Sequence, residues 1–146
     1  MIKNYLLGMY DIAKINAVLT DENDVPNYSF IKKDGVTYLV LQDGSGDDAH
    51  KEGLVVKAGE KINGYDISAW ENQEIVIDEK HISYGSGEDY DDITAGTTLL
   101  TIKADGTLEI ADSAPSTAGE IYFKVTAKTT LTEKAVKAKV LVAAGS

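Results

Sequence analysis

Two Asp-Gly pairs that lie between β-rich runs constrain the fold of this chain more than any other feature of its sequence. They are Asp34-Gly35 and Asp105-Gly106. The runs on either side of each pair are rich in β-branched, aromatic and other apolar residues; they comprise residues 28–32, 36–42, 98–103 and 107–111. An Asp-Gly pair between two such runs is a strong short-range signal of a β-hairpin. We therefore predict two antiparallel hairpins, one in each half of the chain.

The sequence near the C-terminus alternates with the period of a β-strand. In residues 120–127, Ile121, Phe123 and Val125 alternate with more polar neighbours, and residues 135–143 alternate in the same way. We predict that these two runs pair, joined through residues 128–134. Shorter strands are predicted at residues 54–57, 62–67 and 74–78, which gives about nine strands in all. The predicted fold class is mainly β, as a small β-sandwich or as one or two barrel-like domains.

Residues 2–19 are the one stretch with an ambiguous pattern. Its apolar residues lie three and four positions apart, which would place them on one helical face; they are Ile2, Tyr5, Leu6, Met9, Tyr10 and Ala13. Gly8 weakens the helical interpretation. Two alternatives remain: a short helix that packs on the protein's own core, or an extended arm that packs on a partner.

Two features bear on domain organisation. Residues 85–92 combine glycine with a run of acidic residues, a composition typical of a linker. We therefore predict an N-terminal β-rich part over residues 1–84 and a C-terminal β domain over residues 93–146. The single tryptophan, Trp70, is predicted to fill the core or to cover a turn.

The charge balance excludes several classes of partner. The chain has 14 basic and 24 acidic residues, a net charge of −10, and no arginine. Nucleic-acid binders and proteins of anionic membranes need a basic surface, so neither class is expected. No apolar run approaches the length of about 20 residues that spans a bilayer. The N-terminal apolar stretch is too short for a signal peptide, so we expect a soluble protein made in the cytoplasm.

Residue types that carry catalysis or bind cofactors are scarce. The chain has no cysteine and only two histidines, His50 and His81, and neither lies near a serine in a nucleophile motif. Residues 21–24 and 88–92 are acidic enough to consider Ca²⁺, but residues 21–24 lack the glycine and closing glutamate of an EF-hand. We interpret both as solvated loops. We therefore predict no enzyme activity, no catalytic residues, no cofactor and no metal.

The last third of the chain resembles a known family. The sequence Ile93-Thr94-Ala95-Gly96-Thr97-Thr98-Leu99, the Asp105-Gly106 turn and the strand that closes over residues 121–125 resemble the capsid decoration (cement) proteins of tailed bacteriophages. The resemblance covers residues 92–143. The start of the closing strand departs from the family's usual glycine-valine approach, and the first half of the chain has no counterpart that we can place.

The resemblance implies a small, non-catalytic β-rich virion protein. Such proteins bind the outside of an assembled phage head, contact the major capsid protein, and stabilise the shell as trimers or as monomers at local symmetry positions. The N-terminal apolar residues Tyr5, Leu6, Met9 and Tyr10 would then contact the capsid or a neighbouring protomer. Two alternatives stay open: a phage tail tube or fibre module, and a β-sandwich module that binds carbohydrate or another surface.

Overall fold

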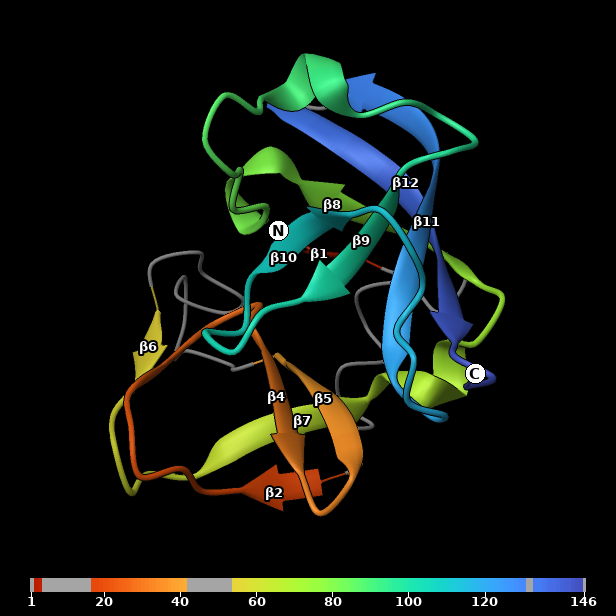
Figure 1. Ribbon diagram of the computed structural model, residues 1–146. Helices are drawn as coiled ribbons and strands as arrows, with labels where there is room; N and C mark the ends of the chain where they lie inside the picture. The colour runs from red at the N-terminus through yellow and green to blue at the C-terminus, as the bar shows by residue number, and fades with distance from the viewer. Residues whose placement is uncertain (1, 4–16, 42–53, 131–132, 146) are drawn as a thin grey trace.

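The computed structural model describes residues 2–3, 17–41, 54–130 and 133–145 of the chain. In these residues the regular structure consists of twelve β-strands and three short 3-10 helices. The fold is mainly β, as predicted, with antiparallel sheets that form a small sandwich or half-barrel arrangement (Figure 1).

The larger sheet has six strands in the order β1-β8-β12-β11-β9-β10. Its strands are β1 (Ile2–Lys3), β8 (Glu74–Asp78), β12 (Lys134–Val142), β11 (Ile121–Thr130), β9 (Leu99–Ile102) and β10 (Leu108–Ala111). All neighbours in it are antiparallel.

The smaller sheet has four strands in the order β2-β7-β5-β4. Its strands are β2 (Ala17–Leu19), β7 (Ile62–Asp66), β5 (Val36–Val40) and β4 (Phe30–Lys33). A separate two-stranded ladder pairs β3 (Val25–Pro26) with β6 (Val55–Val56). In Figure 1 the smaller sheet lies below the six-stranded sheet, so β4 comes near the turn between β9 and β10.

Both predicted Asp-Gly hairpins are confirmed. Asp34 and Gly35 have φ values of 52° and 80°, the two positive values that a type I′ turn requires, and Lys33 pairs with Val36 across the turn. The second hairpin joins β9 to β10, and Leu108 pairs with Ile102. In both cases the local turn chemistry sets the register.

The long C-terminal hairpin is confirmed, but its predicted connection is too long. Residues 128–134 were expected to join the strands, whereas β11 continues to Thr130 and β12 begins at Lys134. The register shifts between Val125 and Ala127, as in a β-bulge, so the simple alternation stops there although the strand does not.

A side chain from outside the hairpin supports this extension. The Tyr90 hydroxyl donates to the backbone oxygens of Ala135, at 2.7 Å, and Thr129, at 3.3 Å. The Lys128 ammonium lies 4.3 Å from the centre of the Tyr90 ring, a cation–π contact. These contacts hold the end of the hairpin against the segment that precedes β9.

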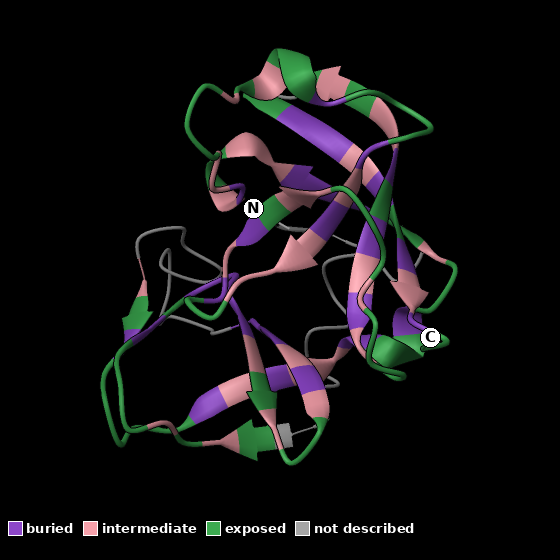
Figure 2. Cartoon of the chain, viewed as in Figure 1, coloured by how far each residue is buried: buried purple, intermediate pink, exposed green. Residues whose placement is uncertain are grey.

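The hydrophobic core joins the two larger sheets (Figure 2). Phe30 of the smaller sheet meets Phe123 of the larger one, with ring centroids 5.4 Å apart. Trp70 is buried at 4% exposure and packs against Tyr65, which confirms its predicted place in the core. It is carried by η3 (Ile67–Trp70), which connects the two sheets between β7 and β8.

The helical alternative for residues 2–19 is wrong at both described ends. Residues 2–3 form β1, which pairs with β8, and residues 17–19 form β2, which pairs with β7. The four predicted contact residues, Tyr5, Leu6, Met9 and Tyr10, lie outside the described residues.

Residues 85–92, predicted as a linker, form an ordered turn between strands of one sheet. Here η5 (Tyr90–Asp92) has a capping box, in which the Asp92 carboxylate accepts from the Asp89 N–H at 2.7 Å. Strand β8, before this segment, pairs with β12, after it. The six-stranded sheet therefore contains strands from both sides of residues 85–92.

Candidate functional site

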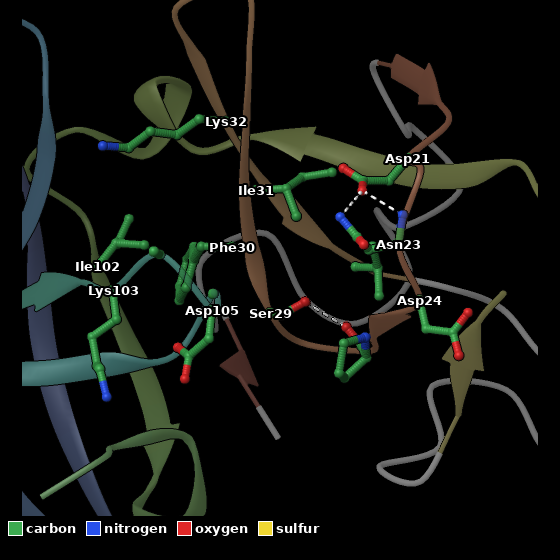
Figure 3. A pocket seen from close by; sticks show the side chains of 14 residues that line it. Asp21, Asn23, Asp24, Ser29, Phe30, Ile31, Lys32, Ile102, Lys103 and Asp105 are labelled. Carbon is green, nitrogen blue, oxygen red and sulfur yellow. Dashed lines mark hydrogen bonds between the residues drawn. The ribbon is translucent and has the colours of Figure 1, made fainter. Parts of the chain in front are cut away.

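A groove of about 860 Å³ opens where the two sheets meet (Figure 3). Three parts of the chain line it: the segment before β4, the strand β4 itself, and the turn that joins β9 to β10. The lining residues are Asp21, Asn23, Asp24, Val25, Pro26, Ser29, Phe30, Ile31, Lys32, Ile102, Lys103, Ala104, Asp105 and Gly106. We call it the β4 groove.

Strand β4 forms the floor of the groove, because side chains from both of its faces line it. Successive residues of a strand point to opposite faces. In Figure 3, Ile31 lies on one side of β4 while Phe30 and Lys32 lie on the other. A groove that contacts side chains from both faces of one strand has to run along the edge of that strand. The topology agrees, since β4 is the last strand of its sheet and, among the described residues, β5 alone pairs with it.

The β9–β10 turn forms one wall and is joined to the floor through the backbone. The Phe30 N–H donates to the Gly106 carbonyl oxygen at 2.9 Å. Gly106 has a φ of 88°, and a Cβ atom there would lie 2.9 Å from the Phe30 carbonyl oxygen. The Asp105-Gly106 pair therefore does more than turn the chain, because its glycine permits close contact with β4.

The Asp105 carboxylate is fixed on this wall. It accepts from the Thr107 hydroxyl at 2.6 Å and from the Thr107 N–H at 3.0 Å. These hydrogen bonds lower the pKa of Asp105, so the carboxylate stays charged over a wider pH range.

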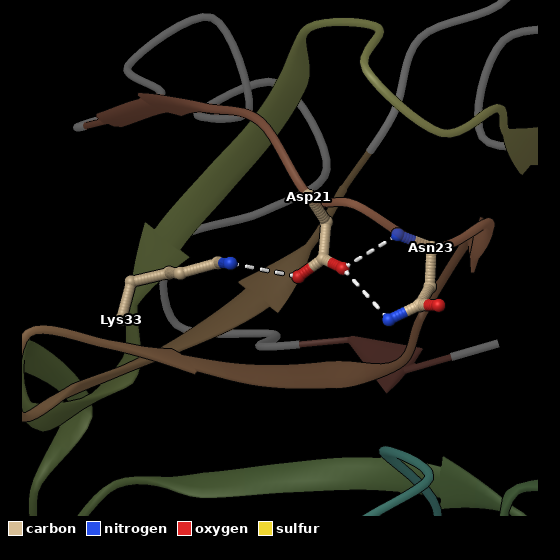
Figure 4. Close-up of polar contacts among 3 residues, drawn as sticks. All are labelled: Asp21, Asn23 and Lys33. Carbon is tan, nitrogen blue, oxygen red and sulfur yellow. Dashed lines mark hydrogen bonds and ion pairs between the residues drawn. The ribbon is translucent and has the colours of Figure 1, made fainter.

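The segment of residues 21–26 forms the opposite wall, and its anchor is Asp21 (Figure 4). One Asp21 oxygen lies 2.8 Å from the Lys33 ammonium, and the other accepts from the Asn23 N–H at 2.9 Å. The hydrogen bond from Lys33, followed by that from Asn23, lowers the pKa of Asp21. This contact ties the wall to the end of β4.

Asp24 adds a second carboxylate to the same wall. It accepts from the Ala58 N–H at 2.9 Å and lies 3.5 Å from the Lys57 ammonium. The hydrogen bond from Ala58 is the main reason that the pKa of Asp24 is lowered. Both partners of the ion pair are more than half exposed, so the pair leaves the carboxylate accessible to solvent.

The groove is therefore suited to binding through backbone, apolar and carboxylate groups. Ile31, Ile102, Val25 and Pro26 supply apolar surface, and Asp24 and Asp105 supply ionised carboxylates. Among the described residues, no group of three or more histidine and acidic side chains is arranged to hold a metal ion. No helix in the part of the chain that the structure describes is long and apolar enough to cross a membrane.

The residues singled out from the sequence are separated in the structure. The acidic run at 21–24 forms the wall of the β4 groove, and the run at 88–92 forms a capped turn at η5. His81 is half-buried and packs edge-on against Tyr28, with ring centroids 5.7 Å apart, while His50 lies outside the described residues.

Comparison with protein-family models, with curated proteins and with solved structures found no match to this chain.

Proposed function

We propose that this chain is a capsid decoration protein of a tailed bacteriophage, a non-catalytic protein that binds the outside of the head and stabilises it. One observation carries the proposal. The residues that resemble decoration proteins, 92–143, contribute β9, β10, β11 and β12, and these four strands are contiguous in the six-stranded sheet. The resembling segment thus corresponds to one uninterrupted block of sheet, as a shared structural unit requires.

The proposed partners are the major capsid protein and other copies of the chain, with a trimer favoured. A net charge of −10 would keep free copies soluble and apart. Repeated sites on a shell would allow weak contacts to act together. The proposed location is the exterior of the virion, after synthesis in the cytoplasm of a bacterial host.

Added protein should raise the temperature at which undecorated, expanded heads release their DNA. The measurement is dye-detected DNA release on heating, with and without the chain, and bovine serum albumin at equal concentration is the control. An unchanged release temperature would contradict the proposal. Rings or tubes of the chain alone in negative-stain images would favour a tail component instead.

The N-terminal apolar residues are proposed as a capsid or protomer contact. Replacing Tyr5, Leu6, Met9 and Tyr10 together by serine should weaken head binding by about tenfold or more, because their apolar surface could no longer be buried at the interface. Co-sedimentation with heads measures the effect, and thermal melting of the free variant checks its fold. Binding equal to that of the wild-type chain would show that these residues are not the contact.

A further inference from the structure

The edge of β4 in the groove presents backbone groups that have no hydrogen-bond partner in the part of the chain that the structure describes. In the hairpin register, Lys33 pairs with Val36 next to a two-residue turn, so Lys33 and Ile31 exchange hydrogen bonds with β5 and Lys32 does not. The Lys32 N–H and C=O therefore point away from β5. Among the described residues, no other strand pairs with β4.

One contact within the protein already uses this edge. Phe30 also points its N–H away from β5, and this group donates to the Gly106 carbonyl oxygen at 2.9 Å. The edge therefore accepts a backbone partner next to Lys32. Beyond Gly106 the groove continues along β4, and its walls are the β9–β10 turn and residues 21–26.

We propose that the β4 groove binds an extended segment of a partner protein, which adds as a strand to β4 and exchanges backbone hydrogen bonds with Lys32. Strand addition to a free sheet edge is a common mode of peptide recognition, in which alternate side chains enter flanking pockets. Here Ile31 and Ile102 would take apolar side chains on opposite faces of β4.

The charges of the groove select the kind of segment. The groove carries the Asp24 and Asp105 carboxylates on opposite walls, and the ammonium groups of Lys32 and Lys103 line it too. Lys32 is paired with Glu120, and the net charge of −10 shifts the remaining balance toward a bound segment that carries a lysine or arginine. The same net charge disfavours a second copy of this chain as the occupant. The inference depends on the groove alone and not on the proposed capsid function.

The test is a displayed library of random 12-residue peptides, selected on the immobilised full-length chain. We expect the selection to enrich peptides with alternating apolar residues and at least one lysine or arginine. Synthetic copies of the enriched peptides are then labelled with a fluorophore, and fluorescence anisotropy gives their dissociation constants.

Two variants at one position separate backbone from side-chain effects. Lys32→Pro removes the outward N–H without breaking the β4–β5 ladder, a substitution that edge strands tolerate. Lys32→Thr keeps the N–H. Both variants lose the ion pair with Glu120, whose atoms are 3.2 Å apart in the native chain, so this loss cancels in the comparison.

We expect Lys32→Pro to weaken peptide binding about tenfold relative to Lys32→Thr, the effect of one lost hydrogen bond. Circular dichroism melts verify that both variants are folded. If Lys32→Pro does not fold, amide hydrogen exchange of the wild-type chain replaces it, and the Lys32 amide should become protected only with peptide. Failure to select any peptide, equal binding by the two variants, or an unprotected Lys32 amide would overturn the proposal. Capsid binding is not needed for any of these results.

Discussion

Replacing Gly106 by alanine should destabilise the protein by about 3 kcal/mol. A residue other than glycine at a φ of 88° costs about 1–2 kcal/mol. The added Cβ would also lie 2.9 Å from the Phe30 carbonyl oxygen and 3.0 Å from the Ser29 Cβ, so β4 and the turn would have to move apart. The measurement is the free energy of unfolding in urea.

Gly96→Ala is the matched control for this substitution. Gly96 has a similar φ of 84°, but nothing lies within 4 Å of the position of an added Cβ. This variant should lose only the conformational contribution, about 1–2 kcal/mol. Equal losses for the two variants would mean that the close contact between the β9–β10 turn and β4 does not contribute to stability.

Acidification from pH 6.5 to 4 should destabilise the protein through His81. Burial lowers the pKa of His81 from 6.5 to about 4, with a smaller opposing effect from Asp78. Between these two pH values the unfolded chain binds a proton at this residue and the folded chain does not, so the free energy of unfolding decreases as the pH falls. Since His81 is only half-buried, we expect a loss of about 2 kcal/mol.

The variant His81→Phe isolates this contribution. It keeps an aromatic ring against Tyr28, which lies edge-on to His81 in the native chain, and it cannot titrate. Urea unfolding of both proteins across this pH range gives two stability curves. The wild-type curve should fall more steeply than that of the variant, and parallel curves would contradict a lowered His81 pKa.

Local sequence signals predicted the hairpins because turn geometry depends on only a few adjacent residues. The two positive φ values at Asp34 and Gly35 are a property of the pair itself. The alternation of residues 120–127 likewise predicted β11, because a strand with one buried face repeats every two residues.

Tertiary contacts decided the features that the sequence did not predict. The register shift after Val125 interrupts the alternation of β11, and Tyr90, more than 30 residues away, supports the extended end of the hairpin. Residues 2–3 and 17–19, at the two ends of the segment considered for a helix, instead pair with the distant strands β8 and β7. Such strand pairings depend on residues far away in the sequence, which a local pattern of apolar residues does not include.

The β4 groove was missed for the same reason. Its walls come from residues 21–26 and 102–106, which are far apart in the sequence. The acidic run at residues 21–24 was noted, but as a solvated loop. A local signal did exist at Gly106, yet its contact with Phe30 becomes evident only once the two sheets are packed together.

Binding to undecorated, expanded heads tests the proposed function most directly. The chain is titrated against heads of the tailed phage that is proposed to encode it, the heads are pelleted, and bound protein is quantified per head. Decoration predicts saturable binding, with a copy number that matches a set of symmetry-related sites on the shell. Binding that never saturates, or no bound protein at any soluble concentration, would contradict it.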